Sequence, residues 1–242
     1  MKKVLIVGGV AGGASTAARL RRLDENLEII MFERGEYVSF ANCGLPYHIG
    51  GVIQNRESLL VQTPESLKAR FNLDVRINSE VIEVNGKEKK VRVKTKNGEE
   101  YEENFDFLVL APGAKPILPA IKGIENKKIF TLRNINDMDK IKSEIKNHNI
   151  KKATVVGGGY VGVETAENLK HLGIDTTLIE AAPHILAPFD SEISNILEYE
   201  LVDNGINLLI SEKVTEFQED KDEVIIKLES GKSVTTDMVI LS

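Results

Sequence analysis

Cysteine is nearly absent from this sequence, because Cys43 is the only one among 242 residues. One thiol cannot form a disulfide within the chain, so the sequence predicts a cytoplasmic protein. Tryptophan is missing and aromatic residues make up only 5% of the chain. The net charge of −6 gives no sign of a basic binding surface. These features argue against nucleic acid and against an anionic membrane as partners.

Long apolar runs are also lacking, and none approaches the roughly 18 residues of a membrane-spanning helix. The four histidines lack the spacing of metal ligands and no zinc or calcium motif occurs, so we expect no metal site. Hydrophobic residues make up 42% of the chain and charged residues 28%, as in ordinary globular proteins. The length suits one large domain or two modest ones.

The chain contains an internal repeat. Residues 2–13 match residues 151–162 at a constant offset of 149. Each copy has the pattern of an apolar strand, a glycine turn and a helix, followed by a second strand that ends in an acid, Glu33 or Glu180. The acid follows the last glycine by 20 residues in the first copy and by 18 in the second. This spacing is typical of a βαβ nucleotide-binding unit.

Each copy continues into a stretch with hairpin signals, residues 80–105 in the first and 214–234 in the second. A buried strand is expected after each stretch, at residues 106–110 and 237–242. The pattern predicts two Rossmann-like three-layer α/β domains, each with a parallel sheet and an inserted β-meander.

The repeat places one domain at residues 1–115 and the other at residues 116–242, with Pro116 and Pro119 in the linker. The second copy stops at Ser242, where the first copy continues into a further turn. We therefore expect this chain to be the N-terminal fragment of a longer protein.

The second glycine turn fits G-x-G-x-x-G with Gly157, Gly159 and Gly162. The first glycine allows a tight turn, the second lets the backbone approach a diphosphate, and the third lets the helix pack on the strand. Glu180 would bind a ribose 2′-hydroxyl and repel a 2′-phosphate, and no Lys or Arg follows it before residue 190, which favours NADH over NADPH. The alternative is a glycine turn without a ligand.

The first glycine turn departs from this pattern, since Gly8, Val10 and Gly13 occupy the three glycine positions. Neighbouring glycines keep the turn slim, and Glu33 stands where a ribose-binding acid is expected. The sequence therefore predicts a nucleotide site here as well.

Cys43 follows the first βαβ pattern closely, and a lone thiol beside two nucleotide sites suggests electron transfer through a flavin to sulfur. Such a thiol forms a mixed disulfide with a small thiol or is oxidised to a sulfenic acid. Asn42 is expected to cap a short helix at residues 45–49, with Cys43 in its first turn, where the helix dipole favours thiolate. The alternative is a buried, inert cysteine.

A cationic helix face is expected near the first turn. Ser15, Arg19 and Arg22 fall at i, i+4 and i+7 on the helix that opens at Gly13, so they share one side. Two guanidinium groups there would clamp phosphates. A solvated helix face is the alternative.

The segment Ser39-Phe40-Ala41-Asn42-Cys43-Gly44-Leu45-Pro46-Tyr47 resembles that of the single-cysteine flavoprotein disulfide reductases. It is similar to the coenzyme A-disulfide reductases and the NADH-dependent persulfide or polysulfide reductases, whose first motif commonly reads Gly-Gly-Val-Ala-Gly-Gly, as residues 8–13 do. The resemblance implies FAD at the first site, a pyridine nucleotide at the second, and coenzyme A. It also implies a homodimer, with a second FAD-binding segment and a dimerisation domain beyond this chain.

The resemblance further implies roles for single residues, with Cys43 as the catalytic thiol. FAD would be held by Gly8, Gly9, Val10, Ala11, Gly12, Gly13, Glu33, Arg34, Val81, Ala111 and Gly113. The pyridine nucleotide would contact Gly157, Gly159, Tyr160, Val161, Gly162, Glu164 and Glu180. Coenzyme A would contact Ser15, Arg19, Arg22, Ser39 and Asn42.

The implied reaction passes a hydride from NAD(P)H to FAD and electrons on to a mixed disulfide between Cys43 and coenzyme A, so that coenzyme A disulfide or a coenzyme A persulfide or polysulfide is reduced. Two alternatives stay open. One is an NADH oxidase or peroxidase in which Cys43 cycles through a sulfenic acid. The other, for this fragment, is a nucleotide-binding module without catalysis.

Overall fold

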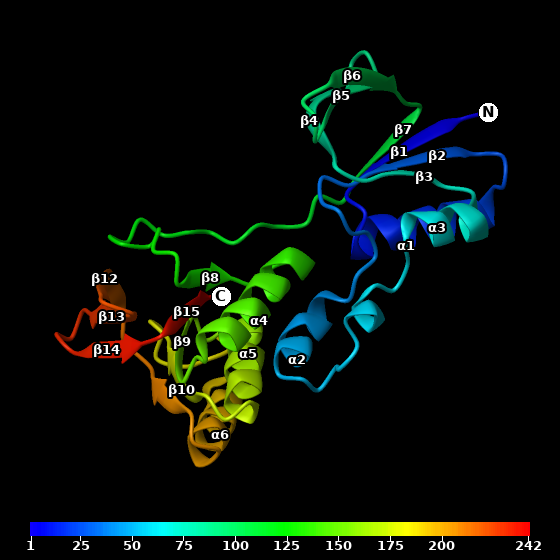
Figure 1. The fold of residues 1–242 in the computed structure, drawn as a ribbon. Helices are drawn as coiled ribbons and strands as arrows, with labels where there is room; N and C mark the ends of the chain where they lie inside the picture. The colour runs from blue at the N-terminus through cyan, green and yellow to red at the C-terminus, as the bar shows by residue number, and fades with distance from the viewer. The chain divides into compact units, whose positions relative to one another are not determined.

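The computed structural model describes all 242 residues and divides them into two compact units. The first unit contains Met1–Ala41 and Glu57–Ala114, and the second contains Asn42–Arg56 and Lys115–Ser242. Both are α/β units built on a parallel sheet (Figure 1), as the sequence predicted. The division differs from two contiguous domains at residues 42–56, which pack with the second unit.

The first unit combines a parallel sheet of order β3-β2-β1-β7 with an antiparallel sheet of order β4-β5-β6. Its strands are β1 (Lys3–Val7), β2 (Glu28–Phe32), β3 (Asp74–Arg76), β4 (Ser79–Asn85), β5 (Lys90–Thr95), β6 (Glu100–Asn104) and β7 (Phe107–Leu110). Its helices are α1 (Ala11–Leu23) and α3 (Pro64–Phe71), and the 3-10 turn η2 (Arg56–Leu59) precedes α3.

Alternation along β1 creates three layers in this unit. Val4 and Ile6 point to one face of the sheet, where they pack in one core with Leu67 of α3. Leu5 points to the other face, where it packs against Val93 of the meander. Because successive side chains of a strand face opposite sides, one strand serves both cores. Figure 1 shows the result, with α1 and α3 below the sheet and β4–β6 above it.

The second unit has a parallel sheet of order β11-β10-β9-β15-β8 and an antiparallel sheet of order β12-β13-β14. Its strands are β8 (Ile129–Thr131), β9 (Lys152–Val156), β10 (Asp175–Ile179), β11 (Asn207–Leu209), β12 (Val214–Asp220), β13 (Glu223–Leu228), β14 (Ser233–Thr236) and β15 (Met238–Leu241). Its helices are α2 (Leu45–Ile49), α4 (Ile135–His148), α5 (Tyr160–His171) and α6 (Ser191–Asp203), and the 3-10 turn η1 (Asn42–Gly44) precedes α2.

The second unit repeats the layered packing. Val239 and Leu241 of β15 form one core with Phe217 and Ile226 of the meander, while α5 packs on β9 and β10. Both predicted meanders are therefore present, and the fold class is confirmed.

The strand that closes each copy is buried to a different degree. β15 lies between β9 and β8, and all four of its residues are buried. β7 pairs with β1 alone, and Phe107 and Leu110 are 52% and 62% exposed. The prediction of a buried strand is correct for β15 and wrong for β7, because an edge strand has a neighbour on one side only.

Turn chemistry sets the helix ends. α3 begins with a capping box at Thr63, has Pro64 in its first turn, and stops at Asn72 in a left-handed conformation. The side chain of Asn134 caps α4, which ends at the left-handed Asn149. None of the helices has the length together with the apolar character that a membrane crossing requires.

Polar contacts hold the segment with Cys43 in the second unit, where α2 packs on α4 and α5. The Arg56 guanidinium donates to the Asp139 carboxylate at 2.6 and 2.9 Å. His48 is buried with Nδ1 at 2.6 Å from the Ile53 carbonyl oxygen. The Lys142 ammonium donates to the His48 carbonyl at 2.8 Å, and burial lowers the pKa of Lys142.

We predict that Gly50→Ala loosens α2. A Cβ on Gly50 would clash with Oδ1 of Asn168 and lie 2.8 Å from its Cβ. Asn168 cannot swing away, because it is buried and donates to the Glu164 carbonyl at 2.8 Å. The expected loss is about 1–3 kcal/mol of stability, with faster proteolysis within residues 42–56. Gly86→Ala, which meets no atom within 4 Å, is the matched control, and equal stability of the two variants would contradict this packing.

Candidate functional site

The first glycine turn needs glycine at two of its three motif positions. Gly8 has φ of +99°, and a Cβ there would clash with the Ala111 carbonyl oxygen. A Cβ on Gly13 would clash with the Gly8 carbonyl oxygen. Val10 is the N-cap of α1 and has φ of −96°. This φ is negative, so valine adopts it without the strain of a left-handed conformation.

The second glycine turn has the same requirements. Gly157 has φ of +112°, and a Cβ on Gly162 would clash with the Gly157 carbonyl oxygen. Gly159 has φ of −73°, and a Cβ there would meet nothing within 4 Å. Neither backbone conformation nor a neighbouring protein atom thus requires glycine at the middle position, which is consistent with Val10 in its place in the first copy.

The acid of the first copy binds the glycine turn directly. The Glu33 carboxylate accepts the Gly9 N–H at 2.8 Å through Oε2 and the Gly35 N–H at 2.8 Å through Oε1. A carboxylate has roughly four acceptor sites. Two bonds to backbone therefore leave acceptor capacity for the hydroxyls of a ribose.

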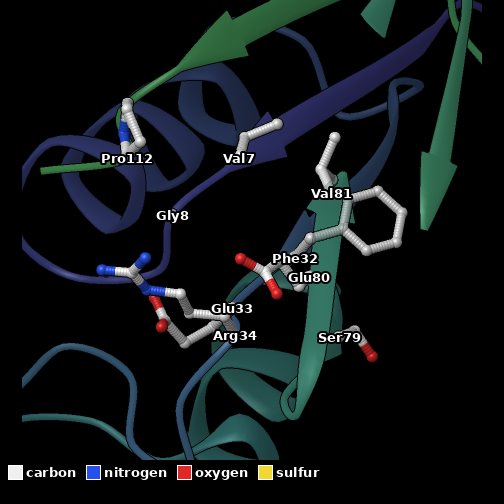
Figure 2. A pocket seen from close by; sticks show the side chains of 9 residues that line it. All are labelled: Val7, Gly8, Phe32, Glu33, Arg34, Ser79, Glu80, Val81 and Pro112. Carbon is white, nitrogen blue, oxygen red and sulfur yellow. The ribbon is translucent and has the colours of Figure 1, made fainter. Parts of the chain in front are cut away.

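A pocket in the first unit joins four of the residues predicted to hold FAD, namely Gly8, Glu33, Arg34 and Val81. The complete lining is Val7, Gly8, Phe32, Glu33, Arg34, Ser79, Glu80, Val81 and Pro112 (Figure 2). The remaining predicted residues lie in the turn, at the start of α1 or after β7: Gly9, Val10, Ala11, Gly12, Gly13, Ala111 and Gly113.

The acid of the second copy repeats this geometry. The Glu180 carboxylate accepts the Gly158 N–H at 2.5 Å and the Ala182 N–H at 2.6 Å. It lines a pocket in the second unit together with Gly157. The lining is Lys115, Pro116, Ile117, Pro119, Val156, Gly157, Ile179, Glu180, Ala181, Glu212, Val214, Leu241 and Ser242.

Sequence reasoning missed Glu212 as a pocket residue. Its N–H donates to the Glu180 carbonyl at 3.0 Å, as the Ser79 N–H donates to the Glu33 carbonyl at 2.9 Å. The Lys232 ammonium contacts its carboxylate at 2.9 Å, and hydrogen bonds from Lys232 and Ser230 lower the pKa of Glu212. The internal repeat was the available signal, because Ser79 and Glu212 donate to the carbonyl of the acid in the same way and each lines the pocket of its copy.

The remaining predicted contacts of the pyridine nucleotide lie on α5. Tyr160 and Val161 are exposed at its start, and the Tyr160 ring meets the Phe189 ring edge-on at 6.0 Å. Glu164 lies 3.5 Å from the Tyr47 hydroxyl. Burial raises the pKa of Glu164, and the negative charge of Glu164 raises the pKa of Tyr47. Glu164 is thus next to the segment that carries the thiol.

The thiol of Cys43 is exposed, so the alternative of a buried cysteine is wrong. The expected cap is wrong as well, because Gly44 is the N-cap of α2 and no side chain caps it. Asn42 and Cys43 form a 3-10 turn before α2, and the Asn42 Oδ1 is buried without a hydrogen-bond partner. Pro46 is the cause, since proline is tolerated only in the first turn and the helix therefore starts directly before it.

The cationic face exists as predicted on α1, although the helix opens at Ala11 and not at Gly13. Ser15, Arg19 and Arg22 are all exposed. The neighbouring Arg21 is buried instead, with its guanidinium donating to backbone carbonyls. Ser39, the remaining residue predicted to contact coenzyme A, has φ of +46° and donates its N–H to the Gly9 carbonyl at 2.8 Å.

The chain matches the model of the pyridine nucleotide-disulphide oxidoreductase family over residues 2–242. It belongs to this family. The coenzyme A disulfide reductase of Staphylococcus haemolyticus is 36% identical over 99% of this chain and 53% of the relative. An NADH oxidase of Methanocaldococcus jannaschii is 33% identical over 99% of this chain and 54% of the relative. The chain therefore spans about half the length of these curated relatives.

A solved structure agrees with this family assignment. The reduced CoADR-RHD of Bacillus anthracis superposes with a TM-score of 0.96 and is 50% identical, covering 100% of this chain and 43% of that one. The fold of this chain is therefore the fold of the matching part of the Bacillus anthracis protein.

We predict that Glu164→Gln raises stability in alkaline solution. Because the folded chain holds the Glu164 proton more tightly than the unfolded chain, stability falls as pH rises from the ordinary pKa of 4.5 through the raised one. Glutamine stays neutral, so its unfolding temperature should exceed that of the parent by about 2–4 °C at high pH. The gap should close toward pH 4. Glu125→Gln, exposed in the same unit, is the control, and a gap that widens in acid would refute the argument.

Proposed function

We propose that this chain forms the FAD-binding and pyridine nucleotide-binding part of an enzyme that reduces disulfide or persulfide sulfur, with Cys43 as its redox-active thiol. The observation that carries the proposal is one exposed thiol in a chain with two glycine turns, each fastened to an acid in the same way. The relative named coenzyme A disulfide reductase supports coenzyme A disulfide, or a coenzyme A persulfide or polysulfide, as the substrate.

FAD fits the first site. The close approach at Gly8 and Gly13 leaves no room for side chains, as a turn that cradles a diphosphate requires. Glu33 keeps acceptor capacity for a ribose, and the exposed Arg34 lines the same pocket. When bound, FAD supplies a ring that takes up a hydride and passes electrons to sulfur.

The pyridine nucleotide fits the second site, with NADH preferred over NADPH. Gly159 leaves open space before the start of α5, where a diphosphate is favoured by the helix dipole. Glu180 is bonded by backbone amides alone and would repel a 2′-phosphate, whereas Glu212 in the same pocket is paired with Lys232, and Lys115 also lines the pocket. Tyr160 and Glu164 would lie toward the nicotinamide.

Cys43 performs the sulfur chemistry in this proposal. Its thiolate attacks one sulfur of a disulfide RSSR, so that a mixed disulfide forms and one RS⁻ leaves. Two electrons from NADH then restore the thiolate and release the second thiol. The balance is NADH + H⁺ + RSSR → NAD⁺ + 2 RSH. Coenzyme A phosphates would bind the α1 face with Ser15, Arg19 and Arg22, and Ser39 and Asn42 precede the thiol.

The NADH oxidase relative supports a second candidate, in which NADH reduces oxygen to peroxide, peroxide oxidises Cys43 to a sulfenic acid with release of water, and a second NADH returns the sulfenic acid to the thiol with release of another water. The exposed cationic face of α1 favours the reductase, because oxygen and peroxide carry no phosphate for it to bind. A third candidate for this chain by itself is a nucleotide-binding module without turnover. We also infer a cytoplasmic location from the single thiol, and a homodimer for the longer protein.

An absorption spectrum tests the proposal. The chain is mixed with FAD and freed of excess, and anaerobic NADH is then added. We expect an oxidised flavin band that NADH bleaches and that coenzyme A disulfide restores. Cys43→Ser should bleach equally and fail to be restored by the disulfide. Reoxidation by peroxide alone would favour the oxidase, and no flavin band would leave the nucleotide-binding module.

We predict that Gly159→Ala separates ligand binding from folding. Its Cβ meets no protein atom and its φ is negative, so the unfolding temperature should stay within about 2 °C of the parent. The methyl group would fill the space expected for the diphosphate, so the Kd for NADH should rise on the order of tenfold. Gly162→Ala is the contrasting variant, because its Cβ clashes with backbone and should lower stability. An unchanged Kd in Gly159→Ala would place the diphosphate elsewhere.

A further inference from the structure

Each copy of the repeat contains a loop that follows the acid and returns to the glycine turn. In the first copy this return loop is residues 34–39. Its last residue, Ser39, has φ of +46° and donates its N–H to the Gly9 carbonyl at 2.8 Å. The side chain of Val38 packs against Gly9, where it would lie 2.7 Å from a Cβ.

The second copy repeats these contacts with different residues. Its return loop is residues 181–186, and Leu186, with φ of +51°, donates its N–H to the Gly158 carbonyl at 2.8 Å. Ile185 packs against Gly158, with Cγ2 at 2.9 Å from the place of a Cβ. Two loops without sequence similarity therefore reach one geometry, six residues after the acid, which indicates that the contact itself is needed.

The contact fixes the direction of a backbone amide. The Gly158 N–H is held by Glu180, and the Gly158 carbonyl is held by Leu186. In a planar trans peptide the N–H points opposite to the carbonyl oxygen. The N–H of Gly159 is consequently aimed away from Leu186. A Cβ on Gly159 would meet no atom within 4 Å, so there is open space at this residue for a diphosphate to accept that N–H.

The two return loops are supported differently. In the first copy, backbone holds the loop, since the Ser39 carbonyl accepts the Val61 N–H at 3.0 Å. In the second copy the backbone also contributes, since the Leu186 carbonyl accepts the Phe189 N–H at 2.9 Å and the Ala182 carbonyl accepts the Ser211 N–H at 2.9 Å, and side chains of α6 hold Ile185 in addition. The Glu198 carboxylate accepts the Ile185 N–H at 3.0 Å, and the Ser194 hydroxyl donates to the Ile185 carbonyl at 2.9 Å. Both side chains are buried, with exposures of 9% and 0%.

We propose that Glu198 and Ser194 are positioning residues for the pyridine nucleotide, because they fix Ile185 and thereby the bond from Leu186 to the Gly158 carbonyl. The inference rests on the proposed function of the second site. His184, whose Nδ1 lies 3.2 Å from the Glu198 carboxylate, completes the environment of that carboxylate. Removing the carboxylate loosens Ile185 and with it the bond from Leu186 to the Gly158 carbonyl, so the Gly159 amide would be held less firmly.

Nucleotide binding to variants of the 242-residue chain tests this inference. NADH is titrated by its fluorescence, and ADP-ribose and adenosine are measured by displacement of NADH. Glu198→Ala should weaken NADH and ADP-ribose alike, on the order of tenfold, since both carry the diphosphate. Adenosine lacks it and should bind unchanged. Glu198→Gln keeps an acceptor for the Ile185 N–H and should recover most of the affinity.

Two further variants complete the design. Ser194→Ala should lower the affinity for NADH and ADP-ribose by a smaller factor. If Glu198→Ala fails to fold, this variant tests the inference in its place. Glu200→Ala is the control. It removes an exposed carboxylate of α6 that accepts a hydrogen bond from Asn204, and it should leave the affinities for NADH and ADP-ribose unchanged. Affinities within about twofold of the parent in all variants would overturn this inference alone. Equal loss of adenosine would also overturn it, and failure of the unaltered chain to bind NADH would overturn the proposed function.

Discussion

The hydrogen bonds between a strand-end carboxylate and the backbone of a glycine turn organise both halves of this molecule. Glu33 and Glu180 each bridge the turn and the residues that follow the acid, at distances of 2.5–2.8 Å. A carboxylate in this position is half-buried, and backbone amides satisfy it before any ligand arrives. The turn is consequently preorganised, and a bound nucleotide would find its amides already directed and an acceptor beside its ribose.

The internal repeat accounts for what the two units share, and packing explains how they differ. In the first copy the chain passes from Ser39 into the segment with Cys43, and residues 42–56 pack on α4 and α5 through Arg56, His48 and Gly50. The segment with the thiol thus belongs to the unit of the second nucleotide site by its contacts, although it follows the first site in sequence. This arrangement gives the redox-active region of the proposed reductase a structural connection to the helix that carries Tyr160 and Glu164.

Sequence alone predicted the features that depend on local rules. Glycines at positions with positive φ, the acids and the two meanders follow from backbone sterics and periodicity, which a single chain displays. The sequence-based predictions were wrong where tertiary packing determines the structure. Asn42 was expected to cap α2, but the helix starts at Leu45, directly before Pro46, and Gly44 is its N-cap. Phe107 and Leu110 were expected to be buried, but β7 has only one neighbouring strand. The sequence analysis missed Glu212 and Glu198 because their partners lie far away in the sequence and no sequence motif includes both residues of the contact.

In the proposed function, the charge of the second pocket would influence the choice between NADH and NADPH. Glu180 alone is a common acid at the end of a strand, and its preference for a ribose hydroxyl is modest by itself. Glu212 adds a second carboxylate, and Lys232 keeps it ionised by lowering its pKa. Lys232 does neutralise part of this charge, yet its ammonium pairs with Glu212 and not with Glu180. A 2′-phosphate entering the pocket would therefore face one carboxylate that is satisfied only by backbone amides, and the exposed Lys115 of the lining is the cation that would oppose this repulsion.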